Sequence, residues 1–111
     1  MYCIINYKLI IMMSNFERVK QFNTVFGHQV SEDKFYNIFD ENPKLVELRN
    51  SLIKEEIGEL NDAYEQHDII EIIDALSDIQ YVAYGLLVVY GVNGDTEYKL
   101  NINKKIDYIN G

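Results

Sequence analysis

The chain has 111 residues, of which 48% are hydrophobic, and this length and composition predict a single folded domain. The formal net charge of −8 argues against a nucleic-acid polymer or an anionic membrane as the main partner. Cys3 is the one cysteine, which excludes a disulfide framework within the chain and a cysteine-based zinc site, and favours an intracellular, cytoplasmic protein.

The first thirteen residues, MYCIINYKLIIMM, are apolar but interrupted by Lys8. They lack the basic start and the small-residue cleavage site of a signal peptide. Because Met13 directly precedes a well-formed helix start, we expect residues 1–13 to be an N-terminal extension, or to lie upstream of the natural start, and residues 14–111 to be the single helical domain. The longest uncharged run, 79–94, is too short to span a bilayer, so no membrane partner is expected.

The first helix is predicted by a capping box. Ser14 and Glu17 have its spacing, and apolar residues follow at helical intervals. We therefore expect a helix from Ser14 to Phe26, ended by the glycine that follows. The next residues, 28–41, have the composition of a connection with one helical turn at about 35–39.

Three further helices are predicted. Asn42 and Pro43 have the form of an N-cap and a first-turn proline, which predicts a helix over 43–66. The third helix is expected over 68–91 and is apolar almost all round, and the fourth over 94–109. No segment has a convincing strand pattern, so the predicted fold is all-α, a four-helix bundle. Because a lone chain of four helices could hardly cover the third one, we expect oligomerisation to complete the bundle.

Acidic residues are concentrated in the middle of the chain. Residues 55–78 contain nine of the eighteen acids and neither lysine nor arginine. A charge run usually marks a solvated face, but the direction of these side chains argues otherwise. At roughly 100° per residue, Glu55, Glu56 and Glu59 fall inside the arc that apolar residues mark as the inward face of the second helix. That arc is defined by Leu45, Leu48, Leu52 and Ala63.

The third helix repeats the pattern, with Glu71, Asp74 and Asp78 on the face of Val82 and Gly85. Two carboxylates about 4 Å apart at an effective dielectric of ~20 repel by about 4 kcal/mol, so five or six gathered acids would not all stay ionised without cations. Oxygen ligands without histidine or cysteine suit Mg²⁺ or Mn²⁺. The sequence therefore predicts a metal site. A di-iron bundle would need Glu-x-x-His on two helices, which neither histidine of this chain provides.

These acids resemble the mark of the MazG-like superfamily of all-α nucleoside triphosphate pyrophosphohydrolases, which includes helical dUTPases, dCTPases and phosphoribosyl-ATP pyrophosphohydrolases. That mark is E-E-x-x-E on one helix and E-x-x-D on the next, and Glu55-Glu56-x-x-Glu59 matches its first half. The stretches ERVKQFNTVFG (17–27), DIQYVAYG (78–85) and KLNINK (99–104) are similar to one branch of it. The resemblance implies assembly as a homodimer or homotetramer.

The second motif departs from the pattern. If Asp78 is its aspartate, the expected glutamate position is Ala75, and Asp74 is expected to replace it. The alternative is Glu71-x-x-Asp74 as a literal E-x-x-D. A second departure is Lys99, which stands where the related pattern has arginine and keeps the charge without the bidentate geometry.

The resemblance also implies a function: Mg²⁺-dependent cleavage of a nucleoside triphosphate to the monophosphate and pyrophosphate, in nucleotide-pool cleaning. The implied metal ligands are Glu56, Glu59, Asp74 and Asp78, with Glu71 as the alternative. Glu55 is expected to hold a further metal or to orient the attacking water. The residues implied in substrate binding are Lys99, Asn101, Lys104, Asn23 and Tyr81, although surface charge or core packing would also account for them.

Two other functions stay open on the sequence. The chain could be a non-catalytic, metal-binding helical dimer that serves as an interaction or regulatory module. It could also be a related enzyme that acts on a phosphoribosyl or an oxidised nucleotide. Metal-dependent pyrophosphate release separates the first from an enzyme, and a panel of substrates separates the second.

Overall fold

The structure, a computed structural model, describes residues 12–28, 30–31 and 37–111. In these residues it contains no strand and five helices: α2 (Asn15–Val25), α3 (Ile38–Glu41), α4 (Pro43–Glu65), α5 (Ile69–Val89) and α6 (Gly94–Asn110). The all-α class is therefore confirmed, and the four long helices begin and end within two residues of the predicted bounds. The predicted extension lies outside the described residues except for its last two. Of the helical turn predicted at 35–39, the first two residues lie outside them and the last two belong to α3.

Side-chain caps fix where the long helices begin. Ser14 Oγ accepts a hydrogen bond from the Glu17 N–H at 3.1 Å. Three further side chains accept in the same way at the starts of α4, α5 and α6: Asn42, Asp68 and Asn93. The glycines after α2 and α5, Gly27 and Gly91, have φ values of 73° and 71°, which glycine adopts without strain.

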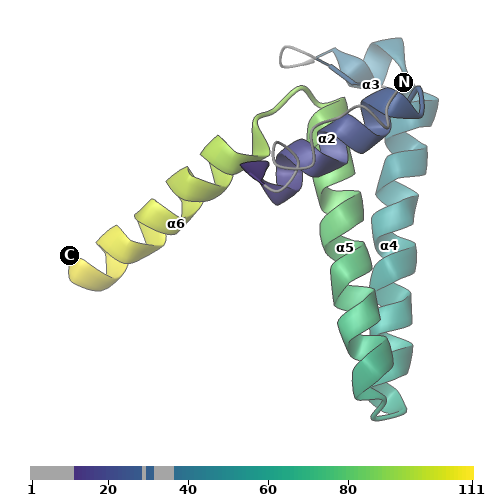
Figure 1. The fold of residues 1–111 in the computed structure, drawn as a ribbon, viewed down its shortest axis with the longest axis vertical. Helices are drawn as coiled ribbons and strands as arrows, with labels where there is room; N and C mark the ends of the chain where they lie inside the picture. Colours follow the sequence, from purple (N-terminus) through teal and green to yellow (C-terminus); the bar gives the residue numbers. More distant parts are fainter. Residues whose placement is uncertain (1–11, 29, 32–36) are drawn as a thin grey trace.

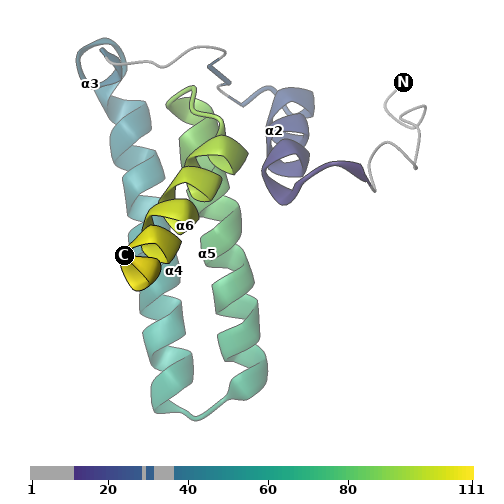
Figure 2. The same cartoon turned by 90° about the vertical axis from the view of Figure 1, so that its left-hand side faces the viewer.

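Helices α4 and α5 form an antiparallel hairpin that is the body of the molecule (Figures 1 and 2). Helix α2 packs against α5, and α3 packs against the start of α4. At this end of the hairpin Ile38, Val46 and Val89 are buried together, with Leu45 and Tyr90 packed against them. This cluster is small and lies at the end of the hairpin where α4 begins and α5 ends, while Ala63 and Ala75 are buried nearer the turn.

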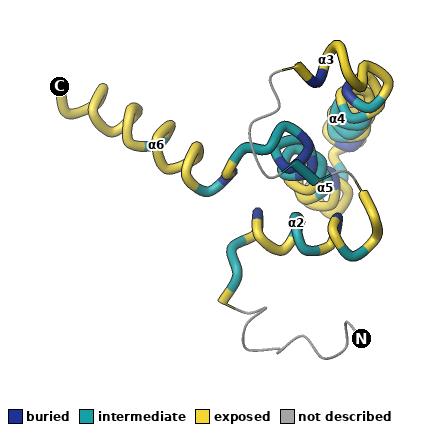
Figure 3. The backbone as a smooth tube through the Cα atoms, turned by 90° about the horizontal axis from the view of Figure 1, so that it is seen from above, coloured by how far each residue is buried: buried dark blue, intermediate teal, exposed yellow. Residues whose placement is uncertain are grey.

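Helix α6 extends away from the hairpin (Figures 1 and 3). Almost all of its residues are exposed, including several large apolar ones. Those apolar residues are Tyr98, Leu100, Ile106, Tyr108 and Ile109. The four long helices of a single chain therefore do not close into the predicted bundle.

The expected burial of α5 on most sides is wrong for the single chain, because none of the described helices covers the side that faces away from α4 and α2. Ile69, Ile70, Ile73 and Leu76 are exposed there. Leu48 was predicted to face inward on α4, but it is 55% exposed, because the described helices do not cover this part of α4 either. By length and composition alone α5 could cross a membrane. Its most apolar stretch of 18 residues has a mean hydropathy of 1.5, and 22% of that stretch is buried. A core helix passes the same test, and α5 carries an aspartate of the cluster described below.

Gly94 marks the junction of α6 with α2. A Cβ there would lie 2.6 Å from Cδ1 of Phe16, whose ring is buried. Nearby, Ser14 Oγ donates a hydrogen bond to Asp95 Oδ2 at 2.6 Å. Because a Gly94→Ala variant must displace the ring, we expect it to lower the free energy of unfolding by about 1–3 kcal/mol in urea denaturation.

A matched control for that variant is Gly58→Ala. A Cβ at Gly58, in the middle of α4, would meet no other atom within 4 Å. We expect this control to raise the free energy of unfolding by up to about 1 kcal/mol, because alanine is the better helix former. Equal stability of the two variants would contradict the packing of Phe16 against Gly94.

Candidate metal centre

Three carboxylates meet between α4 and α5. One ligand oxygen from each of Glu56, Glu59 and Asp78 lies within 4.8 Å of the others. Glu56 and Glu59 are one turn apart on α4, and Asp78 comes from the middle of α5. The antiparallel hairpin therefore creates this group, referred to below as the acid cluster.

Glu56 contributes a buried oxygen to the acid cluster. Its Oε2 is buried and has no hydrogen-bond partner. Burial raises the pKa of Glu56 above its ordinary value of 4.5, and a hydrogen bond with Glu59 and the charges of Glu59, Asp78 and Glu55 raise it further. Burial and the neighbouring carboxylates therefore both oppose ionisation of Glu56.

The acid cluster fits a divalent cation. A carboxylate oxygen that is buried and has no partner is a ligand atom that lacks a compensating positive charge, and a cation would supply that charge. All three donors are oxygens, the type that Mg²⁺ and Mn²⁺ prefer, and among the described residues the group includes no histidine or cysteine.

The other predicted metal ligands, Asp74 and Glu71, are exposed and lie outside the acid cluster. Glu71 lines a neighbouring hollow of about 390 Å³ together with Glu59 and Asp62. The position where the resemblance implies a glutamate is Ala75, which is buried. Asp78 is thus the one residue of α5 in the group of three.

Three other predicted site residues, Glu55, Tyr81 and Asn23, lie outside the acid cluster. Glu55 is exposed and acts on the cluster through its charge. The Tyr81 ring packs edge-to-face on Phe22, with centroids 6.0 Å apart, and is 41% exposed. Asn23 is buried, at 1% exposure, and its Nδ2 has no hydrogen-bond partner.

The predicted phosphate-binding residues lie on α6. Lys99, Asn101 and Lys104 are all exposed there, and Lys105 Nζ donates a hydrogen bond to Asn101 Oδ1 at 3.0 Å. Because α6 extends away from the hairpin, a single chain does not bring these residues to its own acid cluster (Figure 1).

Sequence reasoning missed Arg49. It lies on α4, two helical turns before Glu56, and its Nε is buried without a hydrogen-bond partner. The spacing of seven residues between Arg49 and Glu56 could have indicated it, because this spacing places both side chains on one face of the helix.

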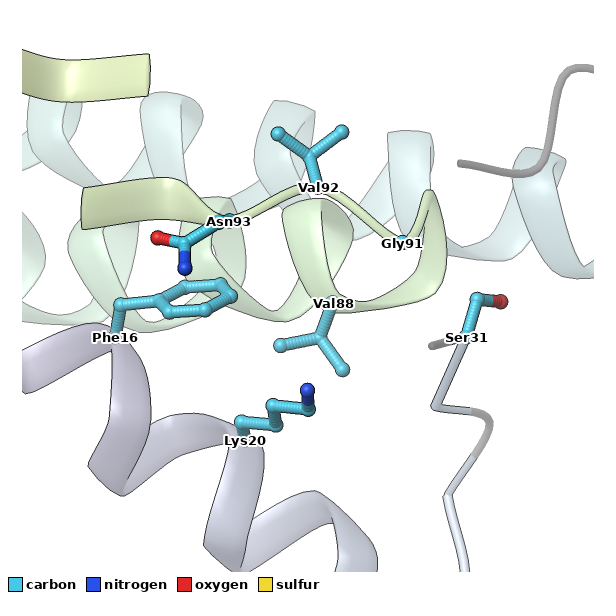
Figure 4. Close-up of a pocket in the computed structure, with 7 residues that line it drawn as sticks. All are labelled: Phe16, Lys20, Ser31, Val88, Gly91, Val92 and Asn93. Carbon is cyan, nitrogen blue, oxygen red and sulfur yellow. The ribbon is translucent and has the colours of Figure 1, made fainter. Parts of the chain in front are cut away.

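A separate pocket of about 150 Å³ lies at the C-terminal end of α5 (Figure 4). Its lining includes no carboxylate and no predicted site residue: Phe16, Lys20, Ser31, Val88, Gly91, Val92 and Asn93. Val88 is ten residues from Asp78 along α5, or roughly 15 Å. This pocket is therefore not part of the acid cluster.

Comparison with known proteins places this geometry in context. Residues 19–100 match the phosphoribosyl-ATP pyrophosphohydrolase family, and this segment contains the whole acid cluster. An uncharacterized protein of Acanthamoeba polyphaga mimivirus is 45% identical over 95 residues, which are 86% of this chain and 38% of that protein. The chain therefore spans well under half the length of this relative.

Proposed function

Because the chain belongs to the phosphoribosyl-ATP pyrophosphohydrolase family, within the MazG-like superfamily of all-α nucleoside triphosphate pyrophosphohydrolases, we propose that it cleaves a ribo- or deoxyribonucleoside triphosphate to the monophosphate and pyrophosphate. The family acts on phosphoric anhydrides. The observation that carries the proposal is the acid cluster, which lies inside the matched segment and has an unpartnered, buried carboxylate oxygen. The proposed setting is the nucleotide pool of the cytoplasm.

In this proposal Glu56, Glu59 and Asp78 hold Mg²⁺, or Mn²⁺ in its place. When bound, the cation neutralises phosphate charge and lowers the pKa of a bound water. Glu56 would bind the cation as the ionised carboxylate. Glu55, at the edge of the acid cluster, orients the attacking water.

We also propose that a homodimer or homotetramer completes the fold. Its support is the exposed apolar side of α5 and the exposed apolar residues of α6, which a second copy would cover. In such an assembly Lys99, Asn101 and Lys104 reach phosphates bound at another subunit's acid cluster, since α6 extends away from its own.

A variant with two glutamates on the exposed side of α5, Ile70→Glu/Ile73→Glu, should be a monomer. Charged side chains lose hydration in an apolar interface without gaining a partner there. Light scattering after size-exclusion chromatography measures the mass, with Asn61→Glu on the exposed side of α4 as the control. A monomeric wild-type protein would refute the proposed oligomer outright.

The test of the proposed function is product release from a panel of ribo- and deoxyribonucleoside triphosphates with Mg²⁺, with Mn²⁺ or with a chelator. We expect pyrophosphate to be released, with at least one nucleotide and only when a metal is present. Release of orthophosphate would indicate removal of the terminal phosphate instead. No release by a folded protein that binds the metal would favour the non-catalytic metal-binding module.

A further inference from the structure

At each end of α6 an asparagine is followed by a glycine, Asn93–Gly94 at the start and Asn110–Gly111 at the end. Such a pair can deamidate without an enzyme or a cofactor. The backbone nitrogen of the glycine bonds to Cγ of the asparagine, and the side-chain amide leaves as ammonia. Water then opens the cyclic imide to aspartate or to isoaspartate. Glycine favours the ring closure, because it has no Cβ to obstruct the approach of its nitrogen.

The packing at the start of α6 requires both residues of the first pair. Gly94 is buried, and a Cβ there would lie 2.6 Å from Cδ1 and 3.0 Å from Cγ of the Phe16 ring. Asn93 caps the helix, since its Oδ1 accepts a hydrogen bond from the Thr96 N–H at 3.0 Å. A chemically labile pair therefore lies at a position where the fold needs these two residue types.

The same contacts oppose the reaction at Asn93. The cap bond holds Oδ1 on the N–H of Thr96, and the Asn93 amide lies beside the buried Phe16 ring (Figure 4). Ring closure needs Cγ of Asn93 to approach the nitrogen of Gly94, which the cap bond and the packing of Gly94 both resist. The rate of deamidation should therefore follow the fraction of molecules in which the first turn of α6 is open.

Asn110 has weaker protection. It is exposed and is the last residue of α6, where a helix frays. The Gly111 N–H donates to the backbone oxygen of Asp107 at 2.8 Å, which is one hydrogen bond of this last turn. Because the two pairs share their chemistry and differ in their surroundings, Asn110 serves as an internal reference for Asn93.

We infer that Asn93 is a deamidation site controlled by the first turn of α6: the closed turn protects the side chain, and each opening exposes it to reaction. The inference goes beyond the proposed function and does not rest on it. Water reaches the site, because Asn93 is exposed and lines both the pocket of about 150 Å³ and a hollow of about 480 Å³.

The two products differ in their effect on α6. Aspartate at position 93 would cap the helix as asparagine does, and its charge is favourable at a helix N-terminus. Isoaspartate adds a carbon atom to the main chain between α5 and α6 and moves the capping group. Formation of isoaspartate should therefore release α6 from its junction with α2.

Peptide mass spectrometry of the full chain, aged at mildly alkaline pH with and without urea, tests the control. In the native protein Asn93 should convert at least about fivefold more slowly than Asn110, the factor that one ordinary N-cap provides. In enough urea to unfold the chain, the two sites should convert at similar rates. Equal rates in the native protein, or protection of Asn93 that persists in urea, would overturn the inference.

Two ring deletions on α2 test the part played by the packing. Phe16 lies against Gly94, whereas Phe22 packs on Phe26 and is 45% exposed. Phe16→Leu should raise the native conversion rate of Asn93 several-fold and leave that of Asn110 unchanged. Phe22→Leu should change neither rate. An unchanged rate at Asn93 in Phe16→Leu would show that the first turn of α6 does not control the reaction.

The melting temperature tests the consequence, in a chain that carries Asn110→Gln to remove the second site. Asn93→Asp should melt as the fresh parent protein does, because aspartate is an equally good cap. The aged parent protein, once isoaspartate has formed at position 93, should melt several degrees lower. An aged protein that melts with Asn93→Asp would show that isoaspartate leaves α6 in place.

Discussion

Replacing Glu56 with glutamine should lower kcat/KM for metal-dependent pyrophosphate release by at least about 100-fold, which corresponds to about 2.7 kcal/mol of transition-state stabilisation. Glutamine keeps the size of the side chain but cannot supply the negative charge that holds the cation. The change falls on the member of the acid cluster whose Oε2 is buried and unpartnered. Steady-state kinetics at saturating Mg²⁺ measures the loss.

The matched control is Glu47→Gln, a loss of the same charge on the exposed side of α4. We expect this control to change kcat/KM by no more than about twofold, as is usual for a surface substitution. A Glu56→Gln enzyme with the activity of the control would exclude the acid cluster as the catalytic metal site.

The second large effect should be a pH-dependent stabilisation by Mn²⁺. Because folding raises the pKa of Glu56 above 4.5, the stability contributed by its proton is present below pH 4.5 and lost as the pH rises through the raised value. Cations bind the deprotonated carboxylates, so their contribution grows over the same interval. Melting temperatures with and without Mn²⁺ should therefore be close below pH 4.5 and diverge as the pH rises toward neutrality.

Thermal unfolding across this pH range, with Mn²⁺ and with a chelator, measures the divergence. Glu56→Gln should melt higher than the wild-type protein when metal-free at neutral pH, because one of the repelling charges is gone. It should also lose most of the gain from Mn²⁺, whereas Glu47→Gln should behave as the wild-type protein does. Parallel curves with and without Mn²⁺ would contradict a metal bound by the acid cluster.

The helices were predictable because their signals are local. The capping side chains of Ser14 and Asn42, and the glycines at the ends of α2 and α5, act on the backbone next to them and need no tertiary partner. The arrangement of the helices was less predictable from the sequence. The direction of α6 and the exposure of Leu48 depend on what covers the hairpin, which the periodicity of a single helix does not specify.

The acid cluster was predictable in part. Glu56, Glu59 and Asp78 stand on inward arcs, and helix geometry alone brought them into the prediction. The sequence predicted Asp74 beside Asp78 as a ligand, because residues four apart on a helix point in nearly the same direction. That only Asp78 of the two joins the acid cluster depends on the pairing of α5 with α4. Arg49 was missed because its neighbours, Asn23 and Gly85, come from two other helices and are far from it in the sequence.

The most direct test of the proposed hydrolase is the fate of the oxygen that water contributes. The reaction is run with Mg²⁺ in water labelled with heavy oxygen, and the products are analysed by mass spectrometry. Attack on the α-phosphorus should place the label in the nucleoside monophosphate and none in the pyrophosphate. Label in pyrophosphate or orthophosphate, or no metal-dependent product at all, would contradict the proposal.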